Sequence, residues 1–192
     1  MSVELLEHFD VFLSHSHNDS AVVEHLAAKL ERVHGFKVWL DKWVLVPGGH
    51  WQQEMARGLE QAKTCAVFVG QRTPQGWFRE EIERALNRQT KNSNFRVIPV
   101  ILPDGESGLV NNFLELRTWV EFKQGIDDGE AFHRLVSGIK GIPPGRYVQV
   151  SEEQTQWREP LLKIKILREE GLIDDKVAEY FQKLILKKMT GI

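Results

Sequence analysis

The stretch Cys65-Ala66-Val67-Phe68-Val69, followed by Gln75-Gly76-Trp77-Phe78-Arg79-Glu80-Glu81-Ile82, decides the fold of this chain. The first run is short and continuously apolar, which is typical of a strand buried on both faces of a sheet. The second run predicts a helix whose apolar residues recur at helical spacing: Phe78, Ile82, Ala85 and Leu86. A helix that follows such a strand begins at the carboxyl edge of the sheet, where open α/β sheets bind ligands.

Other strands are predicted by further runs of apolar and aromatic residues on either side of this stretch. They cover residues 9–14, 37–41, 96–101 and 118–122, the last alternating like an edge strand. Pro99 lies inside the third of these runs and has no N–H to donate. We therefore expect the neighbouring strand to be absent or distorted at Pro99.

Helices are expected between these strands. Asp19 is a natural N-cap for a helix that Gly35 ends, and the stretches 51–62 and 130–139 also show helical spacing. Four or five short strands that alternate with helices predict an α/β protein, with a parallel sheet covered on both faces.

Residues 42–50 separate the second strand from the next helix and include Val44-Leu45-Val46-Pro47-Gly48-Gly49. This segment is too apolar to be fully solvated, and too rich in proline and glycine to be helical. We interpret it as a mobile loop that meets a ligand or a partner.

A boundary is predicted at Ile142-Pro143-Pro144-Gly145, because two prolines and a glycine cannot continue a helix. It divides the chain into a domain of residues 1–142 and a helical hairpin of residues 146–192. Asp174 is positioned to cap the second helix of the hairpin, whose apolar residues are Val177, Tyr180, Phe181, Leu184 and Ile185. Two such helices cannot bury their apolar stripes alone, so we expect the hairpin to dock on its own domain or on another copy.

Composition narrows the class of protein. The chain has 192 residues, is 42% hydrophobic and carries 25 Lys and Arg against 27 Asp and Glu, a net charge of -2. This balance gives no basic surface for nucleic acid. No run has the length to span a bilayer and the N-terminus has no leader pattern, so we expect a soluble cytoplasmic protein without a membrane partner. Cys65, the single cysteine, cannot form an internal disulfide and should be buried.

Candidate chemistry centres on Trp77 and Glu81, which lie four residues apart and therefore share one helical face. Glu81 should sit at the margin of the buried surface. A packed Trp77 ring and a solvated Glu81 carboxylate fit the same spacing, so a purely structural role for both residues stays open. His15 and His17 suggest a metal site near Asp19, but the sequence supplies no further cluster of ligands. We therefore expect no metal, and we assign these histidines to phosphate contacts or turn caps.

Several familiar classes of site are excluded by motif. Neither a dinucleotide-binding G-x-G-x-x-G nor a P-loop occurs. A phospho-acceptor receiver domain does not fit either, because the third strand ends in Gly70 with no aspartate to modify.

With these elements placed, residues 9–142 resemble the TIR (Toll/interleukin-1 receptor) domain family. Phe9-Asp10-Val11-Phe12-Leu13-Ser14-His15-Ser16 is similar to the first box of the family. The family's second strand and BB loop are similar to Trp39-Leu40-Asp41 followed by Pro47-Gly48-Gly49. The catalytic helix of its NAD-cleaving bacterial members is similar to the segment that contains Trp77 and Glu81. Gly70 departs from the pattern, since many relatives carry serine there.

The resemblance implies a flavodoxin-like, doubly wound TIR fold and a site for NAD+ as substrate, with no additional cofactor. Glu81 corresponds to the catalytic residue, and the implied substrate-binding residues are Ser14, His15, Ser16, Asp41, Trp51 and Trp77. The implied products are nicotinamide and either ADP-ribose or a cyclic isomer, in bacterial defence or signalling. Homo-oligomers through TIR–TIR contacts and the hairpin are also implied, and a non-catalytic TIR adaptor is the alternative.

Overall fold

The computed structural model describes residues 9–71, 77–103, 105, 118–148 and 152–190, with the backbone alone at 77–79, 81, 152–159 and 189–190. The chain divides into two compact units, Met1–Tyr147 and Val148–Ile192. The elements of the first unit are β1 (Val11–Ser14), η1 (His17–Asp19), α1 (Ser20–His34), β2 (Val38–Trp39), α2 (Asp41–Val44), α3 (Trp51–Gln61), β3 (Thr64–Val69), α4 (Trp77–Lys91), β4 (Arg96–Ile101), β5 (Val120–Glu121) and α6 (Gly129–Lys140).

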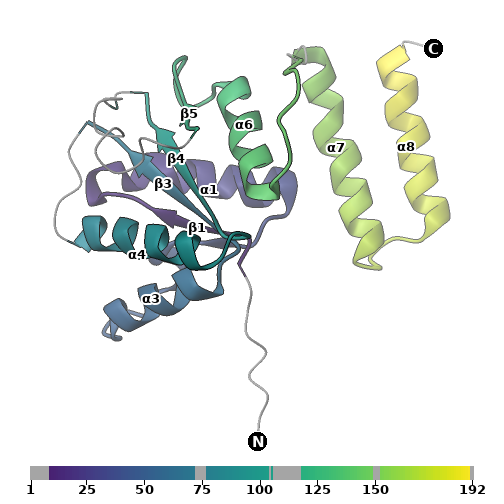
Figure 1. Ribbon diagram of the computed structural model, residues 1–192. Helices are drawn as coiled ribbons and strands as arrows, with labels where there is room; N and C mark the ends of the chain where they lie inside the picture. The colour runs from purple at the N-terminus through teal and green to yellow at the C-terminus, as the bar shows by residue number, and fades with distance from the viewer. Residues whose placement is uncertain (1–8, 72–76, 104, 106–117, 149–151, 191–192) are drawn as a thin grey trace, which may run out of the picture. The chain divides into compact units, whose positions relative to one another are not determined.

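The first unit is built on a five-stranded parallel sheet with the order β2-β1-β3-β4-β5 (Figure 1). Each strand is connected to the next by a crossover, so that all the strands end at the same edge. The predicted α/β class, with a doubly wound parallel sheet, is therefore confirmed.

Helices cover both faces of this sheet, as the sequence predicts. On one face, α1 and α6 pack on the side chains of Leu13, Phe68 and Val100. On the other face, α3 and α4 pack on the intervening side chains of the same strands, including Phe12 and Val67. Alternate residues of each central strand enter different cores, which explains the continuous apolar runs in the sequence.

The edges of the sheet are shorter than the sequence pattern indicates. The pairing of β4 with β5 begins at Val100↔Val120, whereas β3 pairs with β4 without a break, including Val67↔Pro99. Among the described residues, the expectation that a neighbouring strand is absent or distorted at Pro99 is confirmed on the β5 side, where pairing starts only at Val100, whereas β3 pairs regularly on the other side. Cys65 is buried, also as predicted.

The interpretation of residues 42–50 as an entirely non-helical loop is wrong in its first part. Asp41 to Val44 form α2, in which the N–H groups of Trp43 and Val44 donate to the carbonyl oxygen of Leu40 at 2.9 and 3.1 Å. Val44 and Leu45 are half-buried against the core that α3 and α4 cover, while Val46 is 74% exposed. The proline and glycines come after this turn, so they do not prevent it.

The second unit is a pair of helices, α7 (Glu152–Glu169) and α8 (Asp175–Thr190), which pack side by side. The chain turns between them at Gly171, whose φ of 70° lies in the left-handed region that glycine favours. Asp174 caps α8, since its Oδ1 accepts from the N–H of Val177 at 2.8 Å, as predicted. Within the part of the chain that the structure describes, each helix is too short or too polar to span a bilayer.

A close approach at Gly58 fixes the position of α3 on the sheet. The buried ring of Trp39 stacks on Phe12, with centroids 4.2 Å apart and 15° between the ring planes. A Cβ at Gly58 would overlap this indole. The backbone of α3 therefore lies directly on the Trp39 ring, and no larger residue fits there.

We expect Gly58→Ala to lower the free energy of unfolding by about 1–3 kcal/mol, because the buried indole has no space to move into. Gly138→Ala is the matched control in another helix. Its Cβ would lie 3.1 Å from the end of the Ile98 side chain, which can shift, and alanine favours the helix. Chemical denaturation of the three proteins tests this, and equal losses for both substitutions would contradict it.

Candidate functional site

The strand order places a switch point between β1 and β3. From β1 the chain crosses to β2 on one side, and from β2 it crosses back to β3 on the other side of β1. In open α/β sheets, ligands bind at the carboxyl edge beside such a point. The residues that follow β1, β2 and β3 at this edge therefore form the candidate site.

His15, directly after β1, is held by groups from three segments. Its Nδ1 lies 3.4 Å from the carbonyl oxygen of Leu13, and its Nε2 lies 3.2 Å from Ser20 Oγ and 4.0 Å from Asp41 Oδ1. The Ser20 hydroxyl also donates to the carbonyl oxygen of His17 at 2.8 Å. These contacts hold the His15 ring in place and leave only 5% of its side chain exposed.

Asp19 bridges the ends of β1 and β3. Its Oδ2 accepts from Ser16 Oγ at 2.6 Å, and a Cβ at Gly70 would overlap its carboxylate. Asp19 does occupy the N-cap position of α1, as predicted, but its side chain makes no capping hydrogen bond. The structure thus gives a physical reason for Gly70: any side chain there would displace Asp19.

Asp41 and Trp51 lie at the same edge, on α2 and α3. Asp41 Oδ1 accepts from the backbone N–H of Lys42 at 2.7 Å, and 40% of the Asp41 side chain is exposed. Trp51 is the first residue of α3 and is 45% exposed, whereas Ser14 is buried at the end of β1. Two of the predicted residues, His15 and Asp41, are thus brought together from different segments, with Nε2 and Oδ1 4.0 Å apart.

Glu24 on α1 ties down the turn that follows β2. Its Oε2 accepts from Lys42 Nζ at 2.5 Å and its Oε1 accepts from Trp43 Nε1 at 3.2 Å. The hydrogen bond from Lys42, followed by the one from Trp43, holds the pKa of the Glu24 carboxyl below its ordinary value. No signal in the sequence indicates this cluster, because its members lie 18 and 19 residues apart.

The predicted catalytic helix is present as α4, and Trp77 and Glu81 fall in its first two turns. The side chains of Trp77 and Glu81 lie outside the described residues. Ile82 and Ala85 are buried and Glu80 is exposed, so the apolar stripe beside Glu81 is confirmed for these positions.

Arg88 holds α4 against α3. Its Nη1 donates to the carbonyl oxygen of Leu59, and its guanidinium group lies 4.1 Å from the centroid of the Phe95 ring. Burial lowers the pKa of the Arg88 guanidinium, and the nearby Glu60 carboxylate opposes this shift. Since Leu59 is in the last turns of α3, the two helices on this face are fixed relative to each other.

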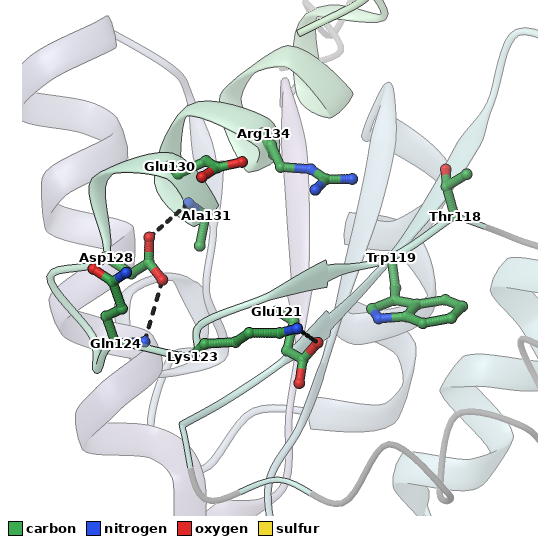
Figure 2. Close-up of a pocket in the computed structure, with 9 residues that line it drawn as sticks. All are labelled: Thr118, Trp119, Glu121, Lys123, Gln124, Asp128, Glu130, Ala131 and Arg134. Carbon is green, nitrogen blue, oxygen red and sulfur yellow. Dashed lines mark hydrogen bonds and ion pairs between the residues drawn. The ribbon is translucent and has the colours of Figure 1, made fainter. Parts of the chain in front are cut away.

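A separate cavity of about 490 Å³ lies beside β5 and α6. Figure 2 shows Asp128 accepting from the N–H groups of Ala131 and Gln124, at 3.0 and 3.2 Å, and Glu121 paired with Lys123 at 3.3 Å. Glu130, Arg134, Thr118 and Trp119 complete its lining. None of the predicted site residues lines this cavity, and no motif in the sequence indicates it.

No group of three or more His, Cys, Asp or Glu side chains within the described ranges could hold a metal ion. The polar groups at the carboxyl edge are instead paired with one another, around His15 and around Asp19.

A sequence profile for the TIR domain matches residues 11–136, well over half of the chain. The chain belongs to the TIR domain family. Its fold is similar to the crystal structure of the TIR domain of the Toll-related receptor TRR-2 from Hydra magnipapillata, with a TM-score of 0.54 and 20% sequence identity. That match covers 69% of this chain and 98% of the Hydra chain. Among curated proteins, no relative matches.

We expect Gly70→Ala to destabilise this TIR domain by about 1–3 kcal/mol, because the added methyl group displaces the Asp19 carboxylate. In an Asp19→Ala background the same change should cost much less, since the space is then open. Denaturation of the four proteins gives the coupling energy, expected at about 1 kcal/mol or more. A coupling energy near zero would contradict the proposed contact.

The Glu24 cluster predicts a pH-dependent contribution to stability. Because the pKa of Glu24 is lowered in the folded state, Glu24 should stabilise the protein at pH values above its unfolded-state pKa of 4.5. This contribution should disappear as the pH falls through the lower pKa of the folded state. Glu24→Gln should therefore reduce stability at pH 7 and match the wild type at low pH, whereas a difference that is constant with pH would contradict the assignment.

Proposed function

We propose that this TIR domain is an NAD+ glycohydrolase or cyclase that cleaves the bond between nicotinamide and ribose. One observation carries the proposal: the sheet has its switch point between β1 and β3, and α4, with Trp77 and Glu81 in its first two turns, follows β3. Because α4 connects two parallel strands, it begins at the edge where Ser14, His15 and Asp41 lie. Groups suited to a nucleotide therefore converge on one edge.

The proposed chemistry requires a fixed negative charge beside the ribose. When the C–N bond breaks, its electron pair leaves with the now neutral nicotinamide, and positive charge develops on the sugar. An ionised Glu81 lowers this barrier electrostatically, and the nearby N-terminus of α4 favours the ionised form. Water, or a nitrogen of the adenine ring, then adds to the sugar carbon with loss of a proton, giving ADP-ribose or a cyclic isomer.

The remaining residues have roles in binding. Trp51 and Trp77 offer aromatic faces to the nicotinamide or adenine ring, and each stack contributes on the order of 1 kcal/mol beyond buried area. Ser14, His15, Ser16 and Asp41 supply polar groups for the phosphates and ribose hydroxyls. The Nε2 of His15 lies 3.2 Å from Ser20 Oγ, so a phosphate oxygen would have to replace that hydroxyl as the partner of the ring nitrogen.

A non-catalytic adaptor is the second candidate. An adaptor would act through TIR–TIR contacts, and the 74% exposed Val46, beside Pro47 and Gly48, offers an apolar loop tip for such a contact. In either case we propose that the protein forms homo-oligomers through TIR–TIR contacts and its hairpin. We also propose that it acts in the cytoplasm, where NAD+ is available, in bacterial defence or signalling.

Release of nicotinamide from NAD+ by the pure protein tests the enzymatic proposal. Glu81→Gln keeps the shape of the side chain and removes its charge, so it should lower turnover by roughly a hundredfold or more. The adjacent Glu80 is exposed on the same helix, and Glu80→Gln is the matched control with near wild-type turnover.

Two results would favour the adaptor instead. One is wild-type turnover in both variants, and the other is a wild-type protein that leaves NAD+ intact at every concentration and state of assembly. Chromatography of the products would also separate ADP-ribose from a cyclic isomer, and so identify the group that attacks the sugar.

A further inference from the structure

One face of α1 contacts both segments that carry the polar groups of the candidate site. Ser20 Oγ lies 3.2 Å from Nε2 of His15, the residue that follows β1. Glu24 lies one turn further along the helix, and its carboxylate accepts from Lys42 Nζ and Trp43 Nε1 of α2. Residues four apart share a helical face, so α1 presents these two contacts side by side.

α1 is held firmly on the sheet by its buried residues. Four of them are 0% exposed and belong to the core on this face: Val23, Leu26, Ala27 and Leu30. They precede and follow Glu24 in the sequence, so the backbone of Glu24 is fixed, while 32% of its side chain is exposed. The Glu24 carboxylate is therefore a fixed point to which a neighbouring segment can be attached.

α2, in contrast, is too short to be stable alone. It has four residues, and its N-cap residue makes no side-chain capping hydrogen bond. A single helical turn of this kind depends on tertiary contacts. One attachment is the packing of Val44 and Leu45 against the core that α3 and α4 cover. A second attachment is the pair of hydrogen bonds that Lys42 and Trp43 donate to Glu24.

These two hydrogen bonds also determine how α2 is rotated about its axis. Adjacent helical side chains leave the axis roughly 100° apart, yet Lys42 and Trp43 both reach Glu24, at 2.5 and 3.2 Å. Any rotation of the turn would separate one of the two donors from the carboxylate. Asp41 is the first residue of α2, and its Oδ1 accepts from the N–H of Lys42 at 2.7 Å. The rotation of α2 therefore sets the position of the Asp41 carboxylate.

We infer that Glu24 is a positioning residue, which holds α2 so that the Asp41 carboxylate stays beside His15. Asp41 Oδ1 lies 4.0 Å from His15 Nε2, and 40% of the Asp41 side chain is exposed to a ligand. α1 thus supplies an anchor for each of the two groups, Ser20 for His15 and Glu24 for Asp41. Where it concerns NAD+, the inference rests on the proposed function, whereas the position of Asp41 does not.

Nuclear magnetic resonance spectra of the full chain test this position without NAD+. Glu24→Ala should shift the ring resonances of His15, which has no contact with Glu24 and is reached through Asp41. Glu31→Ala is the matched control, since Glu31 is an exposed acid two turns further along α1, and it should leave the His15 resonances unchanged. Circular dichroism should show that both variants are folded. Unchanged His15 resonances in Glu24→Ala would overturn the inference.

A second background separates positioning from a general disturbance of α1. In Asp41→Ala protein, Glu24 has no carboxylate to position, so adding Glu24→Ala should no longer shift the His15 ring resonances. A shift of the same size in this background would show that the effect passes through α1 and Ser20 instead, and it would also overturn the inference.

Nicotinamide release tests the consequence for the proposed reaction. Glu24→Ala should raise KM for NAD+ about five- to tenfold and keep kcat within about twofold, since Asp41 is expected to bind substrate and transition state alike. Asp41→Ala should raise KM at least as much, and the double variant no more than Asp41→Ala alone. Glu31→Ala should keep both constants. Additive effects on KM, or a loss in kcat instead, would contradict the positioning role.

The two experiments distinguish failure of this inference from failure of the proposed function. If the wild-type protein leaves NAD+ intact but Glu24→Ala shifts the His15 resonances, Glu24 keeps its positioning role and the cleavage of NAD+ is wrong. If the wild-type protein releases nicotinamide but Glu24→Ala changes neither the His15 resonances nor KM, the cleavage stands and the positioning role is wrong.

Discussion

Burial of the sheet on both faces is the constraint on which the rest of the TIR unit depends. All six residues of β3 are buried, and its alternate side chains enter two separate cores. A strand in this position has no room for working polar groups along its length. Polar groups available to a ligand are therefore confined to the strand ends, where Ser14 and His15 follow the apolar run of β1 and Gly70 follows that of β3.

At the carboxyl edge, the polar groups compensate one another in the structure described. Asp19 accepts from Ser16 over the Cα of Gly70, and His15 Nε2 lies within hydrogen-bond distance of Ser20 Oγ, beside Asp41. Such pairing limits the cost of burying these groups and also holds them in position. Under the proposed function, a phosphate or ribose of NAD+ would have to replace some of these partners, exchanging internal hydrogen bonds for bonds to the ligand.

The two units solve the problem of burial differently. The TIR unit closes its cores within one chain, and Gly58 and Arg88 hold its α3 and α4 close to the sheet and to each other. The hairpin instead leaves Val177, Tyr180, Phe181 and Leu184 of α8 exposed, and Ile164 and Ala178 are the buried apolar residues among its described side chains.

The sequence by itself determined the elements whose signals are local. The continuous apolar runs of β3 and β4, the glycine that ends α1 and the capping Asp174 of α8 are all read from neighbouring residues. Tertiary structure decided what depends on distant pairs. Asp19 meets Gly70, Glu24 meets Lys42 and Trp43, and the β5–α6 cavity gathers side chains from two elements. The turn α2 also forms where proline and glycine follow, because burial of Val44 and Leu45 favours it, and burial is a property of the whole fold.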